Sequence, residues 1–185
     1  LMWNGKTISL AGLLGLASFA SCWNGSPNPV PSTPNTQPTQ ADLIAFHKQR
    51  AAQLDSLISA VASQWPGVTQ TGTGIRLEWL DRTPQATKVS DLPKGTVLEL
   101  HHAFALLDDR VITSWQQDGP LAFELGATDL PTGFHEIIGS AALGDSVRAL
   151  IPPSRAWGMT GLPPDIPQEA VILAEMRIDL YRTPE

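Results

Sequence analysis

A proline-rich segment early in the chain, residues 24–40, places the strongest limit on how this sequence can fold. It reads NGSPNPVPSTPNTQPTQ, with five prolines and almost no apolar side chains. Proline lacks the backbone N–H that helices and sheets use, and the segment has too little apolar surface to bury. We therefore expect a spacer, about 20–25 Å long as a flexible coil and about 50 Å long as polyproline II.

The residues before this spacer have the pattern of an export signal. An apolar run of thirteen residues, ISLAGLLGLASFA (8–20), follows Lys6 and precedes Ser21 and Cys22. The run is too short to cross a bilayer core of about 30 Å as a helix. Small residues directly before a cysteine resemble the processing site of bacterial lipoproteins. We therefore expect residues 1–21 to be a signal peptide and Cys22 to be lipidated, with an ordinary secretory signal and an uncleaved anchor as alternatives.

The resemblance to lipoproteins also implies a location. It places the chain in the bacterial cell envelope, facing the periplasm, with the membrane as a partner through the lipid on Cys22. Residues 22–40 are then the lipidated cysteine and a linker that lifts a domain off the membrane surface. Trp23 stands where some bacterial lipoproteins carry an Asp that keeps them in the inner membrane, which favours the outer membrane.

Charge and cysteine content exclude several classes of protein. The chain of 185 residues has 12 Lys and Arg against 18 Asp and Glu, a net charge of -6. This balance argues against a nucleic-acid partner, because such binding relies on neutralising phosphates. The single cysteine excludes an intrachain disulfide framework and a cysteine-rich zinc site. We expect no metal and no cofactor.

The composition changes to helix formers after the spacer. Apolar residues near three- and four-residue spacing predict an N-terminal helix over residues 41–66, which ends at Trp65-Pro66-Gly67. The residues on its stripe are Leu43, His47, Leu54, Leu57, Ile58 and Val61. Two interpretations stay open: the helix packs on its own domain, or residues 41–64 pair with a second copy in a homodimer.

Beyond residue 67 the apolar pattern alternates as in strands. Residues 96–107, 146–151 and 172–180 are predicted strands. In the first of these, His102 points with the apolar set and His101 to the other side, so the two cannot share a metal ion. Residues 129–142 have helical spacing, with Pro131 tolerated in the first turn. One short helix among antiparallel strands gives an α+β fold for residues 68–185.

A series of motifs in the C-terminal half resembles the FKBP-type peptidyl-prolyl cis-trans isomerases. These motifs are Phe123-Glu124-Leu125-Gly126, Gly133-Phe134, Leu143-Gly144-Asp145, the run IPPSRAWG (151–158) and Ile166-Pro167. The resemblance covers residues 96–182 without an obvious gap, and residues 75–80 would supply a leading strand. It implies a twisted antiparallel β-sheet wrapped around one short helix. It also implies isomerisation of X-Pro bonds in proline-containing polypeptides, here extracytoplasmic proteins that are folding.

The family pattern assigns roles to residues of this sequence. Aromatic and branched aliphatic groups are the equipment of such a site, since rotation about the bond needs no proton transfer. The residues implied as catalytic are Phe123, Phe134, Trp157, Ile166, His102 and Thr113. The residues implied to bind substrate are Ile112, Leu121, Leu130, Pro131, Leu162 and Ala174.

Several of these positions depart from the family pattern. His102 replaces a Tyr, Thr113 replaces an Asp that hydrogen-bonds at the pocket edge, and Ala174 replaces a Phe. Pro131 stands where a backbone N–H usually holds the substrate carbonyl, and proline has no such donor. These changes predict weakened activity, and they support an alternative function: a non-catalytic peptide-binding or chaperone-like module.

Overall fold

The structure, a computed structural model, describes residues 37–127 and 129–184. The expected signal peptide, Cys22 and most of the spacer lie outside the described residues. The helices are α1 (Gln40–Ala62), α2 (Trp115–Asp118) and α3 (Thr132–Gly139), with 3-10 turns η1 (Val89–Asp91) and η2 (Pro153–Arg155). The strands are β1 (Thr69–Gln70), β2 (Arg76–Asp81), β3 (Val97–Leu106), β4 (Val111–Ser114), β5 (Leu121–Glu124), β6 (Ser146–Ile151) and β7 (Ile172–Arg182).

Helix α1 begins where the spacer ends, because Thr39 caps it. The Thr39 hydroxyl accepts from the backbone N–H of Asp42, and the Asp42 carboxylate accepts from the backbone N–H of Thr39. This reciprocal pair is a capping box, which satisfies two N–H groups at the start of the helix. These bonds to Thr39 also lower the pKa of Asp42. An N-terminal helix was expected, and it ends at Ala62, a few residues before position 66.

Only the C-terminal half of α1 packs on the domain. Ile58 and Ala62 are buried, in a cluster with Trp65, Leu150 and Val171. The expected stripe is therefore only partly correct, since Leu43, His47 and Leu57 are exposed. Two ion pairs fasten the helix to the domain: Arg50 to Glu169 at 2.7 Å and Asp55 to Arg76 at 2.8 Å.

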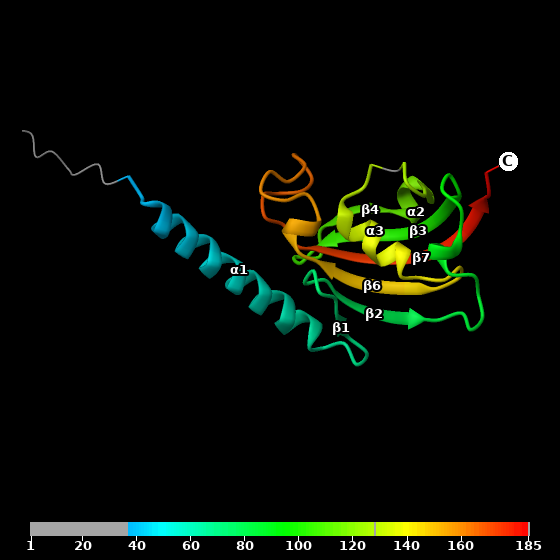
Figure 1. Cartoon of the computed structure of the whole chain (residues 1–185), viewed down its shortest axis with the longest axis horizontal. Helices are drawn as coiled ribbons and strands as arrows, with labels where there is room; N and C mark the ends of the chain where they lie inside the picture. The colour runs from blue at the N-terminus through cyan, green and yellow to red at the C-terminus, as the bar shows by residue number, and fades with distance from the viewer. Residues whose placement is uncertain (1–36, 128, 185) are drawn as a thin grey trace, which may run out of the picture. The chain divides into compact units, whose positions relative to one another are not determined.

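Seven strands form one antiparallel sheet. Six of them follow the order β1-β2-β6-β7-β3-β4, and β5 also pairs with β3. Figure 1 shows β7 running between β3 and β6. The far edge of β3 is shared: its first residues, 97–100, pair with β5 and its later ones, 103–105, pair with β4. Strand β3 thus brings residues from two other strands to one edge, which is where a pocket forms.

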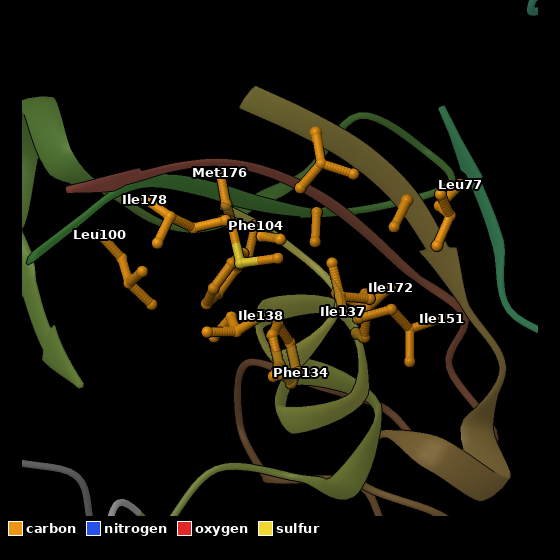
Figure 2. Packing of buried hydrophobic residues seen from close by; sticks show 14 of the residues in the cluster. Leu77, Leu100, Phe104, Phe134, Ile137, Ile138, Ile151, Ile172, Met176 and Ile178 are labelled. Atoms are coloured by element: carbon orange, nitrogen blue, oxygen red, sulfur yellow. The ribbon is translucent and has the colours of Figure 1, made fainter. Parts of the chain in front are cut away.

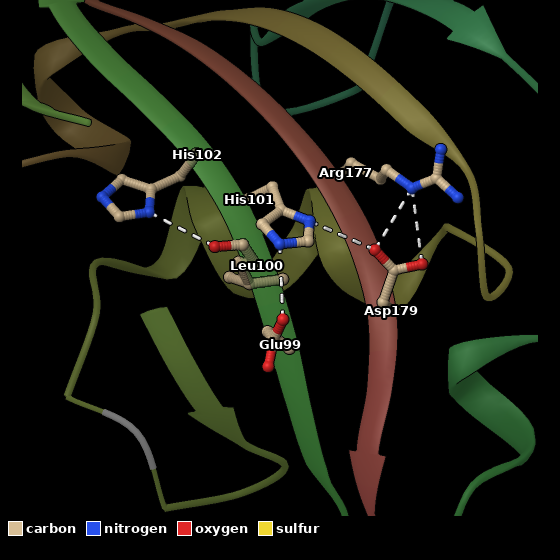
Figure 3. Close-up of polar contacts among 6 residues, drawn as sticks. All are labelled: Glu99, Leu100, His101, His102, Arg177 and Asp179. Carbon is tan, nitrogen blue, oxygen red and sulfur yellow. Dashed lines mark hydrogen bonds and ion pairs between the residues drawn. The ribbon is translucent and has the colours of Figure 1, made fainter. Parts of the chain in front are cut away.

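Burial along β3 follows the two-residue period of the sequence. Leu98, Leu100, His102, Phe104 and Leu106 are buried, and the residues between them are partly exposed. Side chains alternate between the faces of a strand, so the buried set faces α3. Figure 3 shows His101 and His102 leaving β3 on opposite sides, as the alternation predicts.

The main core lies between the sheet and α3. Phe134, Ile137 and Ile138 on α3 are fully buried against strand residues such as Phe104 and Ile178 (Figure 2). The helix is shorter than expected, and Pro131 is its N-cap rather than part of its first turn. Pro131 fits there because an N-cap residue is not yet helical. The α+β fold inferred from the sequence, an antiparallel sheet against one short helix, is confirmed.

The shortest elements were not expected. They are β1, β4, β5 and α2, none longer than four residues. Such segments contain too few positions for a period to appear, and their strands exist because β2 and β3 offer them partners. Within the described part of the chain, no helix has the length and apolar character needed to cross a membrane.

Candidate functional site

A pocket of about 340 Å³ opens at the edge of the sheet where β3, β4 and β5 meet. The loop that follows η2 closes its other side. Most of its lining is apolar, and among the described residues that line it Asp118 is the only acidic one. It is lined by His102, Phe104, Ile112, Thr113, Asp118, Gly119, Pro120, Leu121, Leu130, Trp157, Leu162 and Ile166.

Three aromatic rings form what we call the aromatic floor: Phe104, Phe134 and Trp157. The ring centroids of Phe104 and Phe134 are 4.8 Å apart, and those of Phe134 and Trp157 are 5.6 Å apart with the rings edge to face. Phe134 is fully buried and supports the other two from the side of the core. Edge-to-face and tilted pairs at these distances are favourable for aromatic rings. The floor is therefore continuous with the hydrophobic core.

Gly133 lets the floor assemble. A Cβ at this position would lie 2.7 Å from the carbonyl oxygen of Arg155 and 2.7 Å from a methyl group of Ile151. The N-terminus of α3 can therefore approach η2 only because residue 133 has no side chain. This close approach brings Phe134 against the loop that carries Trp157.

Three hydrogen-bonded residues form what we call the polar wall: His102, Thr113 and Asp118. The Thr113 hydroxyl lies 3.1 Å from Nε2 of His102 and donates to Oδ2 of Asp118 at 2.6 Å. The backbone N–H of Ser114 donates to the same Asp118 oxygen at 3.2 Å. The bonds from Thr113 and then Ser114 hold the pKa of Asp118 below its ordinary value. The wall thus ends in a carboxylate that stays ionised.

Eight of the residues that the family pattern assigned to a site line this pocket. They are His102, Ile112, Thr113, Leu121, Leu130, Trp157, Leu162 and Ile166. The structure thus brings together residues from β3, β4, β5 and the two loops around α3 and η2.

Four assigned residues do not line the pocket. Phe134 lies beneath it as part of the floor, and Phe123 is buried with its ring 4.9 Å from that of His135. Ala174 is fully buried near the start of β7, paired with Phe104 of β3, and does not line the pocket. Pro131 caps α3 and its carbonyl accepts from the N–H of Phe134.

Phe104 and the segment Asp118-Gly119-Pro120 line the pocket but were not assigned to it from the sequence. Phe104 belongs to the apolar face of β3, so its pattern indicated only burial. An Asp-Gly-Pro run indicates a turn. Only the fold shows that this turn lies against Thr113.

A larger groove of about 420 Å³ lies between α1 and η2, away from the aromatic floor. Among the described residues that line it, His47 has the only aromatic ring. Arg50 and Glu169, which also line it, form an ion pair. It therefore lacks the aromatic surface of the smaller pocket.

His101 lies outside the pocket, on the open face of the sheet. Its two ring nitrogens are 3.3 Å from a Glu99 oxygen and 3.4 Å from an Asp179 oxygen (Figure 3). It does not meet His102. Across residues 37–127 and 129–184, no group of three or more His, Cys, Asp or Glu side chains is placed to hold a metal ion.

Comparison with known proteins agrees with this geometry. A family model for the FKBP-type peptidyl-prolyl cis-trans isomerase matches residues 89–178, a stretch that contains every pocket residue. Peptidyl-prolyl cis-trans isomerase FKBP11 of Bos taurus is 29% identical over 111 residues, which are 56% of this chain and 55% of that protein. Peptidyl-prolyl cis-trans isomerase FKBP2 of Bos taurus is 26% identical over 126 residues, which are 68% of this chain and 84% of that protein.

Solved structures share the fold at low sequence identity. FkpA from Escherichia coli matches with a TM-score of 0.59 at 19% identity, over 78% of this chain and 66% of that chain. A peptidyl-prolyl cis-trans isomerase from Pseudomonas syringae matches with a TM-score of 0.58 at 19% identity, over 71% and 92%. The chain spans about half the length of bovine FKBP11. The family match over residues 89–178, together with the fold and the pocket, shows that this part of the chain is a domain of the FKBP-type peptidyl-prolyl cis-trans isomerase family.

Proposed function

We propose that the pocket between the aromatic floor and the polar wall catalyses cis-trans isomerisation of X-Pro bonds in polypeptides. The observation that carries this proposal is an apolar pocket built around Trp157 and Ile166 within an FKBP-type domain. The substrate is a proline-containing segment of an incompletely folded protein.

Isomerisation of an X-Pro bond requires no proton transfer, so the site needs no catalytic acid or base. Rotation about an X-Pro bond faces a barrier of about 18–20 kcal/mol, because amide resonance is lost, although the two isomers differ by only about 0.5–1 kcal/mol. Water stabilises the planar, more polar amide. A pocket with an apolar lining therefore lowers the barrier by favouring the twisted, less polar state.

Trp157 is the residue best placed to hold the substrate. Its loop is fixed by bonds from the N–H groups of Ala156 and Gly158 to the Pro153 carbonyl at 3.1 and 2.8 Å. Within the described part of the chain, the indole N–H has no hydrogen-bond partner. We propose that it donates to a carbonyl next to the prolyl bond, while the ring covers the proline.

A second function, peptide binding without catalysis, is favoured by Pro131. Its nitrogen cannot donate to a substrate carbonyl. Loss of one neutral hydrogen bond corresponds to about 0.5–1.5 kcal/mol, or roughly a tenfold loss of rate at most. We therefore favour a weakened enzyme over an inactive one.

The test is isomerisation of a short X-Pro peptide by the full chain and by Trp157→Ala. A rate above the uncatalysed one that falls at least tenfold in Trp157→Ala supports the enzyme. Trp79→Ala is the matched control, because Trp79 is also partly buried but lies on β2 beneath Arg82, outside the pocket. An uncatalysed rate with the unaltered chain would contradict the enzymatic function and leave the binding module.

The place of action is proposed from the first residues of the sequence. Cys22 is a lipid attachment site that tethers the domain to the periplasmic face of a bacterial membrane, with the outer membrane favoured, and its substrates are extracytoplasmic proteins. Lys6, the apolar run 8–20 and the small residues before Cys22 support this proposal. Mass spectrometry of the mature N-terminus should find acylated Cys22, and a free thiol there would contradict the anchor.

We also propose that α1 pairs with α1 of a second copy. Support comes from apolar side chains in its first half that remain exposed, among them Leu43, Ile44 and Phe46. Analytical ultracentrifugation should then find a dimer that Phe46→Glu shifts towards monomer. A monomer at all concentrations would exclude the homodimer.

A further inference from the structure

The polar wall contains a chain of hydrogen bonds that crosses three elements. His102 comes from β3, Thr113 from β4 and Asp118 from the end of α2. The distances are 3.1 Å from Nε2 of His102 to the Thr113 oxygen and 2.6 Å from that oxygen to Oδ2 of Asp118. All three residues line the pocket. These hydrogen bonds therefore link an exposed carboxylate to His102, of which only 3% is exposed.

The available protons determine which group donates in each of these hydrogen bonds. A threonine hydroxyl has one proton, and an ionised carboxylate can only accept. The hydroxyl proton of Thr113 therefore goes to Asp118, whose pKa is lowered by this bond. The Thr113 oxygen is left with lone pairs only, so it can only accept from His102. Nε2 of His102 must then carry a proton.

The other contacts of His102 fix the plane of its ring. Nδ1 lies 3.3 Å from the carbonyl oxygen of Leu100, as Figure 3 shows. The imidazole is tilted by 47° against Phe104, with the centroids 4.9 Å apart. With the proton on Nε2, a neutral ring has a lone pair on Nδ1. The Leu100 carbonyl oxygen can only accept, so it then makes a close contact with Nδ1 rather than a hydrogen bond. The ring offers the pocket its carbon surface rather than a donor.

We propose that Asp118 is a positioning residue that, through Thr113, fixes His102 with a proton on Nε2 and so holds the imidazole as the side wall of the proline pocket. This inference rests on the proposed function only for its effect on the reaction. The Asp118 carboxylate reaches His102 only through the hydroxyl of Thr113, whereas a carboxylate at position 113 would contact the imidazole directly.

The competing explanation is that Asp118 only stabilises the turn of α2, through its bond from the Ser114 N–H. A direct readout of the imidazole separates the two. Long-range proton-nitrogen spectra of the labelled full chain report which nitrogen of His102 carries a proton. We expect a protonated Nε2 in the unaltered chain, and a loss of that signature in Asp118→Ala and in Thr113→Val.

Conservative variants serve as rescue. Asp118→Asn keeps an oxygen that accepts from Thr113, and Thr113→Ser keeps the hydroxyl, so both should retain the Nε2 signature. Asp108→Ala is the matched control, because Asp108 also accepts from a backbone N–H in a neighbouring turn, from Arg110 at 3.2 Å, but does not line the pocket. It should leave His102 unchanged.

The same variants should change catalysis in parallel. We expect kcat/KM to fall roughly two- to tenfold in Asp118→Ala and Thr113→Val, with Asp118→Asn and Thr113→Ser near the unaltered chain. An unchanged His102 signature in Asp118→Ala would overturn the proposal, whatever the activity. If the signature responds but the unaltered chain catalyses nothing, the positioning role stands and the proposed isomerase function fails.

Discussion

The aromatic floor and the polar wall enclose the same pocket but are held in place by different forces. Phe134 in the floor is fully buried and packs on the core between α3 and the sheet. Asp118 in the wall is exposed and held by two hydrogen bonds. Packing in a close-packed core tolerates little change, whereas exposed polar groups can be exchanged at small cost in stability. Substitutions in the floor and in the wall should therefore have different effects on stability.

The largest expected effect breaks the floor. Phe134→Ala should lower the free energy of unfolding by about 3–5 kcal/mol, because it removes a fully buried ring and leaves a cavity. Denaturant unfolding measures the change. Met159→Ala, at a position 60% exposed in the loop after η2, should change stability by less than about 0.5 kcal/mol. A similar loss in both variants would show that Phe134 is not part of the core.

The contact beneath the floor can be tested with two glycines of α3. Gly133→Ala should destabilise the chain by about 1–3 kcal/mol, because its Cβ would meet the Arg155 carbonyl and Ile151. Gly139→Ala has nothing within 4 Å of the new Cβ. It should stabilise the helix by up to about 1 kcal/mol. Equal stability of Gly133→Ala and Gly139→Ala would contradict the close contact between α3 and η2.

A smaller expected effect distinguishes the contribution of the Trp157 ring to catalysis from that of its N–H. Trp157→Phe keeps an aromatic ring in the floor but removes the donor. We expect kcat/KM for an X-Pro peptide to fall roughly two- to tenfold with little change in stability. If Trp157→Phe kept full activity and Trp157→Ala lost it, the ring alone would be the catalytic feature.

The smallest expected effect concerns the wall and appears only at acid pH. Bonds from Thr113 and Ser114 lower the pKa of Asp118 from its ordinary 3.8. A group whose pKa is depressed on folding contributes stability above its unfolded pKa and loses it as the pH falls through the folded value. A titration of the Asp118 carboxyl carbon by NMR should therefore have its midpoint below 3.8, and Thr113→Val should move it back up. A midpoint at the ordinary value in the unaltered chain would contradict the bond to Thr113.

The parts of the fold with a clear repeating pattern were predictable from the sequence. Strands β3, β6 and β7 and helix α3 each bury residues at the spacing their sequences show. Strands β4 and β5 were not, because four residues show no clear period and their pairing with β3 is a long-range contact. Most of the pocket residues followed from the family motifs. Asp118 did not, because its role depends on how the turn after α2 folds back onto Thr113.

Two residues that the family pattern assigned to the site show that a sequence motif does not determine which side chains line the pocket. Ala174 on β7 is fully buried in the main core and does not line the pocket. Phe123 keeps the ring expected from the motif, and that ring is directed against His135. In both cases the motif identified the correct strand, and only the packing shows which side chains reach the substrate side.

The most direct test of the central claim is exchange spectroscopy on the prolyl signals of a peptide mixed with a small amount of the full chain. This measurement observes cis-trans exchange and binding in one sample. We predict exchange between the cis and trans signals that the unaltered chain accelerates and Trp157→Ala does not. Shifts in the signals of His102, Thr113 and Trp157 with no acceleration of exchange would contradict the account and show that the pocket binds proline segments without isomerising them.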